Sequence, residues 1–94
     1  MYVISLTYLV DIDVMDEARP RHLEWLQKHY DADLFLASGR KTPATGGVIL
    51  ARAMPREKLD QILATDPFAL ENLATYDIIE FDPAMTCSAL AGVA

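Results

Sequence analysis

The sequence contains a single cysteine, Cys87, which excludes a disulfide within the chain. Secreted domains of this size usually depend on disulfides for their stability, so we expect a cytoplasmic protein. No apolar run approaches the ~20 residues that a membrane helix needs, and the apolar segment 2–10 lacks the basic flank and cleavage site of a signal peptide. We therefore expect no membrane as a partner.

Basic side chains are scarce. Eight Lys and Arg residues are outnumbered by fourteen Asp and Glu residues, which gives a net charge of -6 at pH 7. Proteins bind nucleic acids largely through basic side chains that release counterions from the phosphates. This charge balance argues against nucleic acid as a partner.

Motifs that hold metals and cofactors are also missing. The sequence has no CxxC or HExxH motif, and six residues separate its two histidines, His22 and His29, which makes them a weak metal pair. It has no GxGxxG, Walker or GxSxG motif, so nothing predicts a dinucleotide, a nucleoside triphosphate or a serine hydrolase. We expect no metal ion and no cofactor.

What the sequence does have is a high apolar content in a short chain. Its 94 residues are 52% hydrophobic, which fits one globular domain, residues 1–94, and excludes a disordered chain. A domain this small leaves about a third of its chain surface exposed. We expect a second copy of the chain to cover part of that surface, as a homodimer.

Apolar segments rich in β-branched and aromatic residues predict four strands, at residues 2–10, 34–38, 48–53 and 76–82. The second and third strands are separated by a turn-rich loop and should form a hairpin. The uncharged tail, residues 84–94, fits two states equally: it is either loose or packed on a partner subunit.

Helical spacing of apolar residues predicts a first helix over residues 19–30, with Asp13 or Asp16 as its N-cap and Pro20 in its first turn. A second helix is expected to open at Pro55. Asp66 precedes a proline and is the expected cap of a short third helical piece that reaches about residue 73.

The predicted order is β-α-β-β-α-β, which is the α+β, ferredoxin-like arrangement: a four-stranded antiparallel sheet with the helices on one face. The other face of such a sheet is left bare. Two bare faces packed together around a two-fold axis would form the expected homodimer.

His22 and Asp66 are the two candidates for proton transfer. His22 falls inside the apolar stripe of the first helix, so its ring should point toward the sheet, and His29 should lie at the surface near the helix end. An Asp66 carboxylate within reach of His22 would orient the ring as a general base. The plain alternatives are a core histidine bonded to a backbone carbonyl and an aspartate that only caps a helix.

A second group of candidates follows the second strand. Ser38 and Gly39 end it, and Arg40 and Lys41 come next, which suggests a docking site for an anionic or phenolic small molecule. The plain alternative is a solvated hairpin loop. Trp25 lies off the apolar stripe and is expected at a pocket rim or an interface.

Five short motifs occur in an order that resembles the YciI-like (YCII-related domain) family. They are RHLEWL (21–26), LASGR (36–40), GGVIL (46–50), DPF (66–68) and IEF (79–81). The resemblance implies a dimeric α+β barrel, related in fold to muconolactone isomerases and small cofactor-free monooxygenases. It also implies a His/Asp pair at a pocket, and His22 and Asp66 occupy those positions.

Two functions remain open. The first is a small cofactor-independent enzyme, an isomerase or a dehydrochlorinase-like lyase. In it, His22 would move a proton on a hydroxylated aromatic or lactone-like substrate, while Ser38 and Arg40 hold its oxygen atoms. The second is a binding or accessory module that uses the same pocket without turnover.

Overall fold

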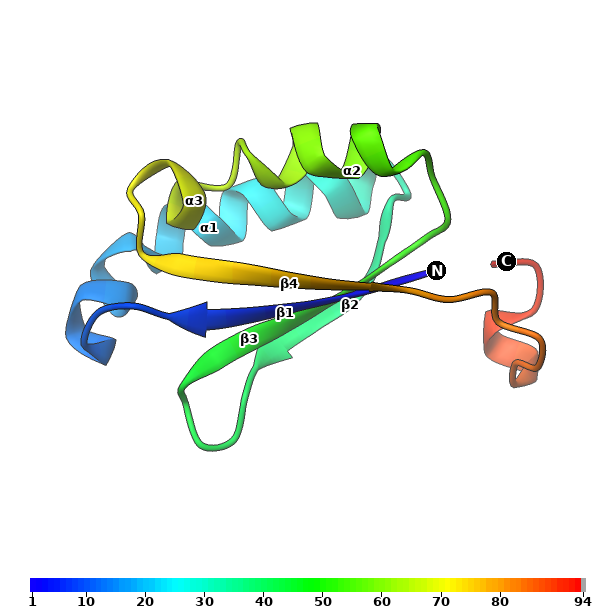
Figure 1. Ribbon diagram of the computed structural model, residues 1–94, viewed down its shortest axis with the longest axis horizontal. Coiled ribbons are helices and arrows are strands. Elements are labelled where there is room, and N and C mark those ends of the chain that lie inside the picture. The colour runs from blue at the N-terminus through cyan, green and yellow to red at the C-terminus, as the bar shows by residue number, and fades with distance from the viewer. Residues whose placement is uncertain (94) are drawn as a thin grey trace.

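The computed structural model describes residues 1–93, which form one antiparallel sheet with helices on one side (Figure 1). The strands are β1 (Tyr2–Tyr8), β2 (Phe35–Arg40), β3 (Gly46–Ala51) and β4 (Ala74–Glu80), in the spatial order β2-β3-β1-β4. The helices are α1 (Ile12–Asp31), α2 (Arg56–Leu63) and α3 (Pro67–Leu70), and a 3-10 turn, η1 (Ser88–Leu90), lies in the tail. The predicted ferredoxin-like fold and the β2–β3 hairpin are confirmed.

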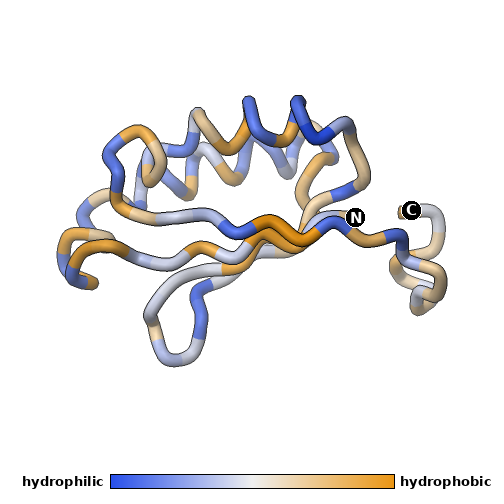
Figure 2. The backbone as a smooth tube through the Cα atoms, in the orientation of Figure 1, coloured by the Kyte–Doolittle hydropathy of each residue, from blue (hydrophilic) through white to orange (hydrophobic). Residues whose placement is uncertain are grey.

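Side chains alternate between the two faces of the sheet, as strand geometry requires. In β1, Tyr2, Ile4 and Leu6 are buried beneath the helices, while Ser5 and Thr7 point to the opposite face. The helices close the core with buried residues that lie three, four or seven positions apart along α1 and α2. Figure 2 shows the result: apolar segments gather in the sheet, and apolar and polar turns alternate along the helices.

The face of the sheet away from the helices carries an apolar row. Val3 of β1 pairs with Leu50 of β3 and with Ile79 of β4, so these three side chains lie side by side. Val48 extends this row along β3, two residues before Leu50, and Ile79 is 59% exposed. We call Val3, Val48, Leu50 and Ile79 the open-face row; it lies on the bare face expected from the sequence.

The first helix differs from the prediction. It begins at Ile12 rather than near residue 19, with Asp11 as its N-cap, so neither Asp13 nor Asp16 caps it. Pro20 lies inside the helix and not in its first turn. The extra turns form because they bury Met15 and other apolar side chains in the core, which offsets the backbone hydrogen bond that Pro20 cannot make.

Strand ends also differ. Strand β2 continues through Gly39 and Arg40, which were expected in a bend and a loop, because Arg40 pairs with Gly47. Strand β1 ends at Tyr8, and β3 and β4 each begin and end two residues earlier than predicted. The tail contains η1 and a buried Val93, while residue 94 lies outside the described residues.

Gly46 is the position where the sheet admits no side chain. A Cβ there would collide with the backbone carbonyl oxygen of Leu6, whereas a Cβ at Gly39 would meet no atom within 4 Å. We expect Gly46→Ala to lower the free energy of unfolding by about 1–3 kcal/mol or more, because backbone must move to make room. Gly39→Ala is the matched control and should leave urea unfolding nearly unchanged; equal midpoints for the two variants would contradict this account.

Candidate functional site

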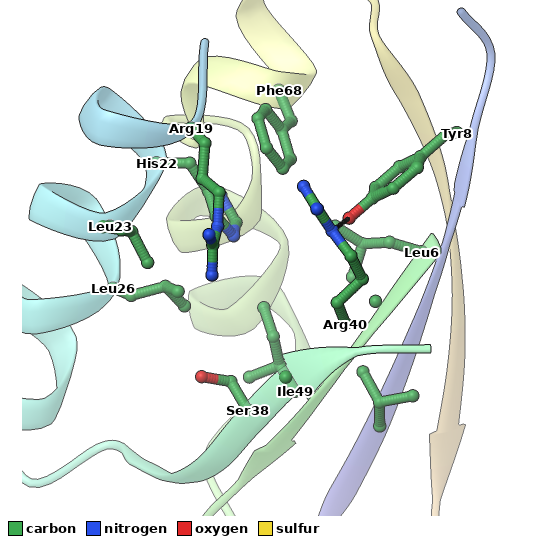
Figure 3. A pocket seen from close by; sticks show the side chains of 13 residues that line it. Leu6, Tyr8, Arg19, His22, Leu23, Leu26, Ser38, Arg40, Ile49 and Phe68 are labelled. Atoms are coloured by element: carbon green, nitrogen blue, oxygen red, sulfur yellow. Dashed lines mark hydrogen bonds between the residues drawn. The ribbon is translucent and has the colours of Figure 1, made fainter. Parts of the chain in front are cut away.

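A hollow of about 440 Å³, a volume that includes open solvent at its mouth, lies between the helices and the sheet (Figure 3). Its lining comes from α1, α3 and the three strands β1, β2 and β3. The side chains that shape it are Leu6, Tyr8, Arg19, His22, Leu23, Leu26, Ser38, Arg40, Ile49 and Phe68. We call this hollow the α1–sheet pocket.

His22 and Asp66 meet at the pocket although 44 residues separate them. The Nδ1 atom of His22 lies 2.7 Å from Oδ1 of Asp66, and the two side chains are 12% and 0% exposed. Since a carboxylate only accepts hydrogen bonds, Nδ1 is the donor. The other ring nitrogen, Nε2, is therefore free to accept a proton at the pocket.

Asp66 contacts His22 and also caps helix α3. Its Oδ1 accepts a second hydrogen bond, from the backbone N–H of Phe68 at 3.0 Å. Its Oδ2 accepts one from the Tyr76 hydroxyl at 2.5 Å. Both oxygens of a fully buried carboxylate are thus occupied, which satisfies a charge that would otherwise be costly to bury.

Tyr76 contacts the candidate pair, although the sequence analysis placed this position only at the start of the fourth predicted strand. It lies on the helix-covered face of β4, where burial and the hydrogen bond to Asp66 raise the pKa of its hydroxyl far above the ordinary value. Tyr76 therefore stays protonated and acts as a fixed donor to Asp66. No local pattern reveals this role, because the two residues meet only through the packing of β4 against α3.

Aromatic rings hold the His22 imidazole in place. Phe68 stacks on it with ring centres 4.0 Å apart and planes 6° apart, and Trp25 lies on another side at 5.7 Å. Phe68 follows Asp66 by two residues, so the same short helix positions both the carboxylate and the stacked ring. The imidazole is thereby held in one orientation by two contacts and a hydrogen bond.

Trp25 was expected at a pocket rim or an interface, but in the structure it lies in the core. Its side chain is buried behind His22, and its Nε1 donates a hydrogen bond to Oγ1 of Thr65 at 2.9 Å. It is not among the residues that line the pocket. Trp25 thus packs against His22 from the core.

Ser38, Gly39 and Arg40 line the pocket, but from a strand and not from a loop. The Arg40 guanidinium donates to Asp16 at 2.7 Å and more weakly to the Tyr8 hydroxyl at 3.4 Å. The hydrogen bond to Asp16 raises the pKa of Arg40 and neutralises its charge locally. Lys41 does not line the pocket.

Ser38 has an internal partner as well. Its Oγ lies 2.6 Å from the Tyr30 hydroxyl, and either atom can donate. A ligand oxygen that approaches Ser38 would therefore share a hydroxyl pair with Tyr30. Among residues 1–93, no group of three or more His, Cys, Asp or Glu side chains lies close enough to hold a metal ion.

His29 is buried and does not lie at the surface as predicted. It follows Trp25 by one helical turn, so it lies on the buried face of α1, between Trp25 and Phe35. The apolar stripe predicted for the first helix is therefore rotated from the true buried face, where Trp25 and His29 are buried while Leu23 is 45% exposed. Burial lowers the pKa of His29, and its Nε2 has no partner in the described chain.

The fold and the pocket together define a small ferredoxin-like α+β domain with a His–Asp pair at one end of its sheet. The model of the YCII-related domain matches residues 1–82, and the chain belongs to that family. No curated protein matches the chain in sequence.

Among solved structures, the chain is similar to the 5-chloro-2-hydroxyhydroquinone dehydrochlorinase TftG from Burkholderia phenoliruptrix AC1100, in complex with 2,5-dihydroxybenzoquinone. The TM-score is 0.74 at 14% identity, over 86% of this chain and 92% of the other. This likeness establishes the shared fold. In residues 1–93, no helix is both long and apolar enough to cross a membrane.

The buried His29 predicts a specific pH dependence of stability. Its pKa is lower in the folded state than the ~6.5 of an exposed histidine, so the unfolded chain takes up the proton first as the pH falls. The free energy of unfolding should fall below about pH 6.5, by at most about 1.4 kcal/mol per pH unit from this residue.

Urea unfolding at about pH 7.5 and about pH 5.5 measures this loss, and His29→Phe should reduce it because Phe does not titrate. A control variant, His22→Gln, removes the other histidine and should keep the contribution of His29. Identical pH dependence in the wild type and His29→Phe would contradict the assignment.

Proposed function

We propose that the protein is a cofactor-independent enzyme in which Nε2 of His22 moves a proton on a small hydroxylated aromatic or lactone-like substrate. The strongest support is the 2.7 Å contact between Nδ1 of His22 and the Asp66 carboxylate. That carboxylate also accepts hydrogen bonds from the Phe68 amide and the Tyr76 hydroxyl. Asp66 fixes the tautomer of the ring and stabilises the imidazolium that forms when Nε2 accepts a proton.

The reaction is an isomerisation or an elimination. In an elimination, His22 takes a proton from the substrate while a leaving group departs with its electron pair; in an isomerisation, His22 returns the proton to another atom. Both reactions are redox-neutral and need no electron acceptor. The oxygen atoms of the substrate would be held by Ser38 and Arg40, which face His22 across the pocket (Figure 3).

The dehydrochlorinase TftG supports the substrate class, because its name describes loss of hydrogen chloride from a hydroxylated aromatic ring. Phe68 lines the pocket beside His22 and fits the same class, since it adds aromatic surface next to the base. A binding module without turnover is the second candidate. It is favoured by the internal partners of Ser38 and Arg40, which a ligand must share or replace.

A double-mutant cycle tests the proposed chemistry. Chloride release from 5-chloro-2-hydroxyhydroquinone and calorimetric binding of 2,5-dihydroxybenzoquinone are measured for the wild type, His22→Gln, Asp66→Asn and the double variant. We expect each single variant to slow turnover by about 10²-fold or more, and the double variant to be little worse, because the two residues act as one unit.

Asn caps helices about as well as Asp, so Asp66→Asn removes the charge while keeping the cap of α3. Binding should survive in His22→Gln even where turnover is lost. Binding without turnover in the wild type would favour the binding module, and no binding of either compound would refute a hydroxylated aromatic ring as the ligand of the pocket.

We further propose that the protein is a homodimer closed by the open-face row. The open-face row is a contiguous apolar surface on the sheet face away from the described helices. Such a surface is costly to leave in water. Two open-face rows packed face to face around a two-fold axis would remove these side chains from solvent.

Sedimentation should therefore give about twice the 10.5 kDa chain mass. Ile79→Lys places a charge in the open-face row and should yield monomers. Leu70→Lys is the matched control, because Leu70 is similarly exposed, at 67% against 59%, but lies on α3 away from the sheet face. A wild-type monomer, or dissociation of the control variant as well, would contradict the proposed interface.

A further inference from the structure

We propose that Arg19 binds a carboxylate of the substrate, so that the pocket prefers a hydroxylated cyclic carboxylic acid to the same ring without the carboxylate. This inference rests on the proposed function and narrows its substrate class. It concerns a side chain that neither the motifs nor the charge pattern of the sequence singled out.

Arg19 belongs to the pocket by position. It precedes His22 by three residues on α1, so the two side chains leave the helix on the same side. Both line the α1–sheet pocket, and Figure 3 shows the Arg19 side chain extending beside the His22 ring toward the hollow. A ligand that reaches His22 therefore passes within range of the Arg19 guanidinium.

Arg19 differs from the other four arginines in its partners. Each of the others forms an ion pair, at 2.7 to 3.0 Å: Arg21 with Glu71, Arg40 with Asp16, Arg52 with Asp33, and Arg56 with Asp60. Within the described residues, Arg19 has no carboxylate at ion-pair distance, although the chain carries an excess of acidic groups. Among the described residues that line the pocket, Arg19 is thus the arginine without a carboxylate partner.

The charges of the pocket also determine where an anion can sit. Asp66 is buried at the inner end beside His22, so a substrate carboxylate would be repelled from that end. Arg40 is already occupied by Asp16. The exposed Arg19 is left as the attractive position, where its planar guanidinium can hold a carboxylate with two hydrogen bonds.

This arrangement orients the substrate. The carboxylate would lie at the mouth on Arg19, and the hydroxylated ring would lie inward, between His22 with its stacked Phe68 and the Ser38 side of the pocket. The proton that His22 removes would then belong to the ring or its hydroxyl, and the carboxylate would remain unchanged.

A matched pair of ligands tests the inference by calorimetry at about pH 7. Hydroquinone and 2,5-dihydroxybenzoate share the same ring and hydroxyls and differ by one carboxylate. We expect the wild type to bind the acid about tenfold or more tightly than hydroquinone, as one charge-assisted bidentate contact would give. Arg19→Gln should abolish that preference, and Arg19→Lys should keep part of it.

Arg21→Gln is the matched control, because Arg21 lies two residues away on the same helix but pairs with Glu71 outside the pocket lining. It should retain the full preference. The preference should also survive His22→Gln, since it reflects binding and not proton transfer.

The possible failures can be told apart. Equal affinity for the two ligands in the wild type, or a preference that persists in Arg19→Gln, would overturn the role of Arg19 and leave the proposed function standing. No binding of either ligand would overturn the substrate class itself, and the role of Arg19 with it.

Discussion

The buried carboxylate of Asp66 is the constraint on which the site depends. A carboxylate without contact with water is stable as an anion only if hydrogen-bond donors replace the lost solvent. Here the donors come from three separate elements: His22 from α1, the Phe68 amide from α3 and the Tyr76 hydroxyl from β4. Asp66 thereby joins α1, α3 and the edge strand β4 at one point. Its requirement for hydrogen-bond donors fixes where His22 must lie.

The same residue links stability to chemistry. As the N-cap of α3, Asp66 sets the start of the short helix that presents Phe68, and Phe68 in turn stacks on the His22 ring. The ring is oriented by groups that the fold needs in any case, so little conformational freedom is lost when a ligand arrives. Tyr76 completes the arrangement because its protonated hydroxyl can only donate to the remaining oxygen of Asp66.

The fold was largely predictable from the sequence, because strand alternation and helix periodicity are local signals. The pairing of His22 with Asp66 was anticipated from the position of each residue and from the resemblance to the family. The burial of His29 was not anticipated. Leu23 lines the pocket and is not part of the core, so the apolar residues of the helix do not show which face is buried. The start of α1 was missed because Pro20 favours a first turn locally, while tertiary packing of Met15 outweighs that preference.

The charged residues of the pocket show why a ligand-binding site cannot be predicted from local sequence and composition alone. The sequence shows Arg40 and Lys41 side by side and suggests a cationic loop, but β2 continues through Arg40 and brings it to Asp16, 24 residues away. A long-range ion pair thus compensates the Arg40 charge that the local pattern suggests is available to a ligand. Arg19, inconspicuous beside Pro20, keeps its charge because no carboxylate of the described chain packs against it. The charge available to a ligand is therefore what remains after tertiary pairing, and it cannot be counted before the strands and helices are in place.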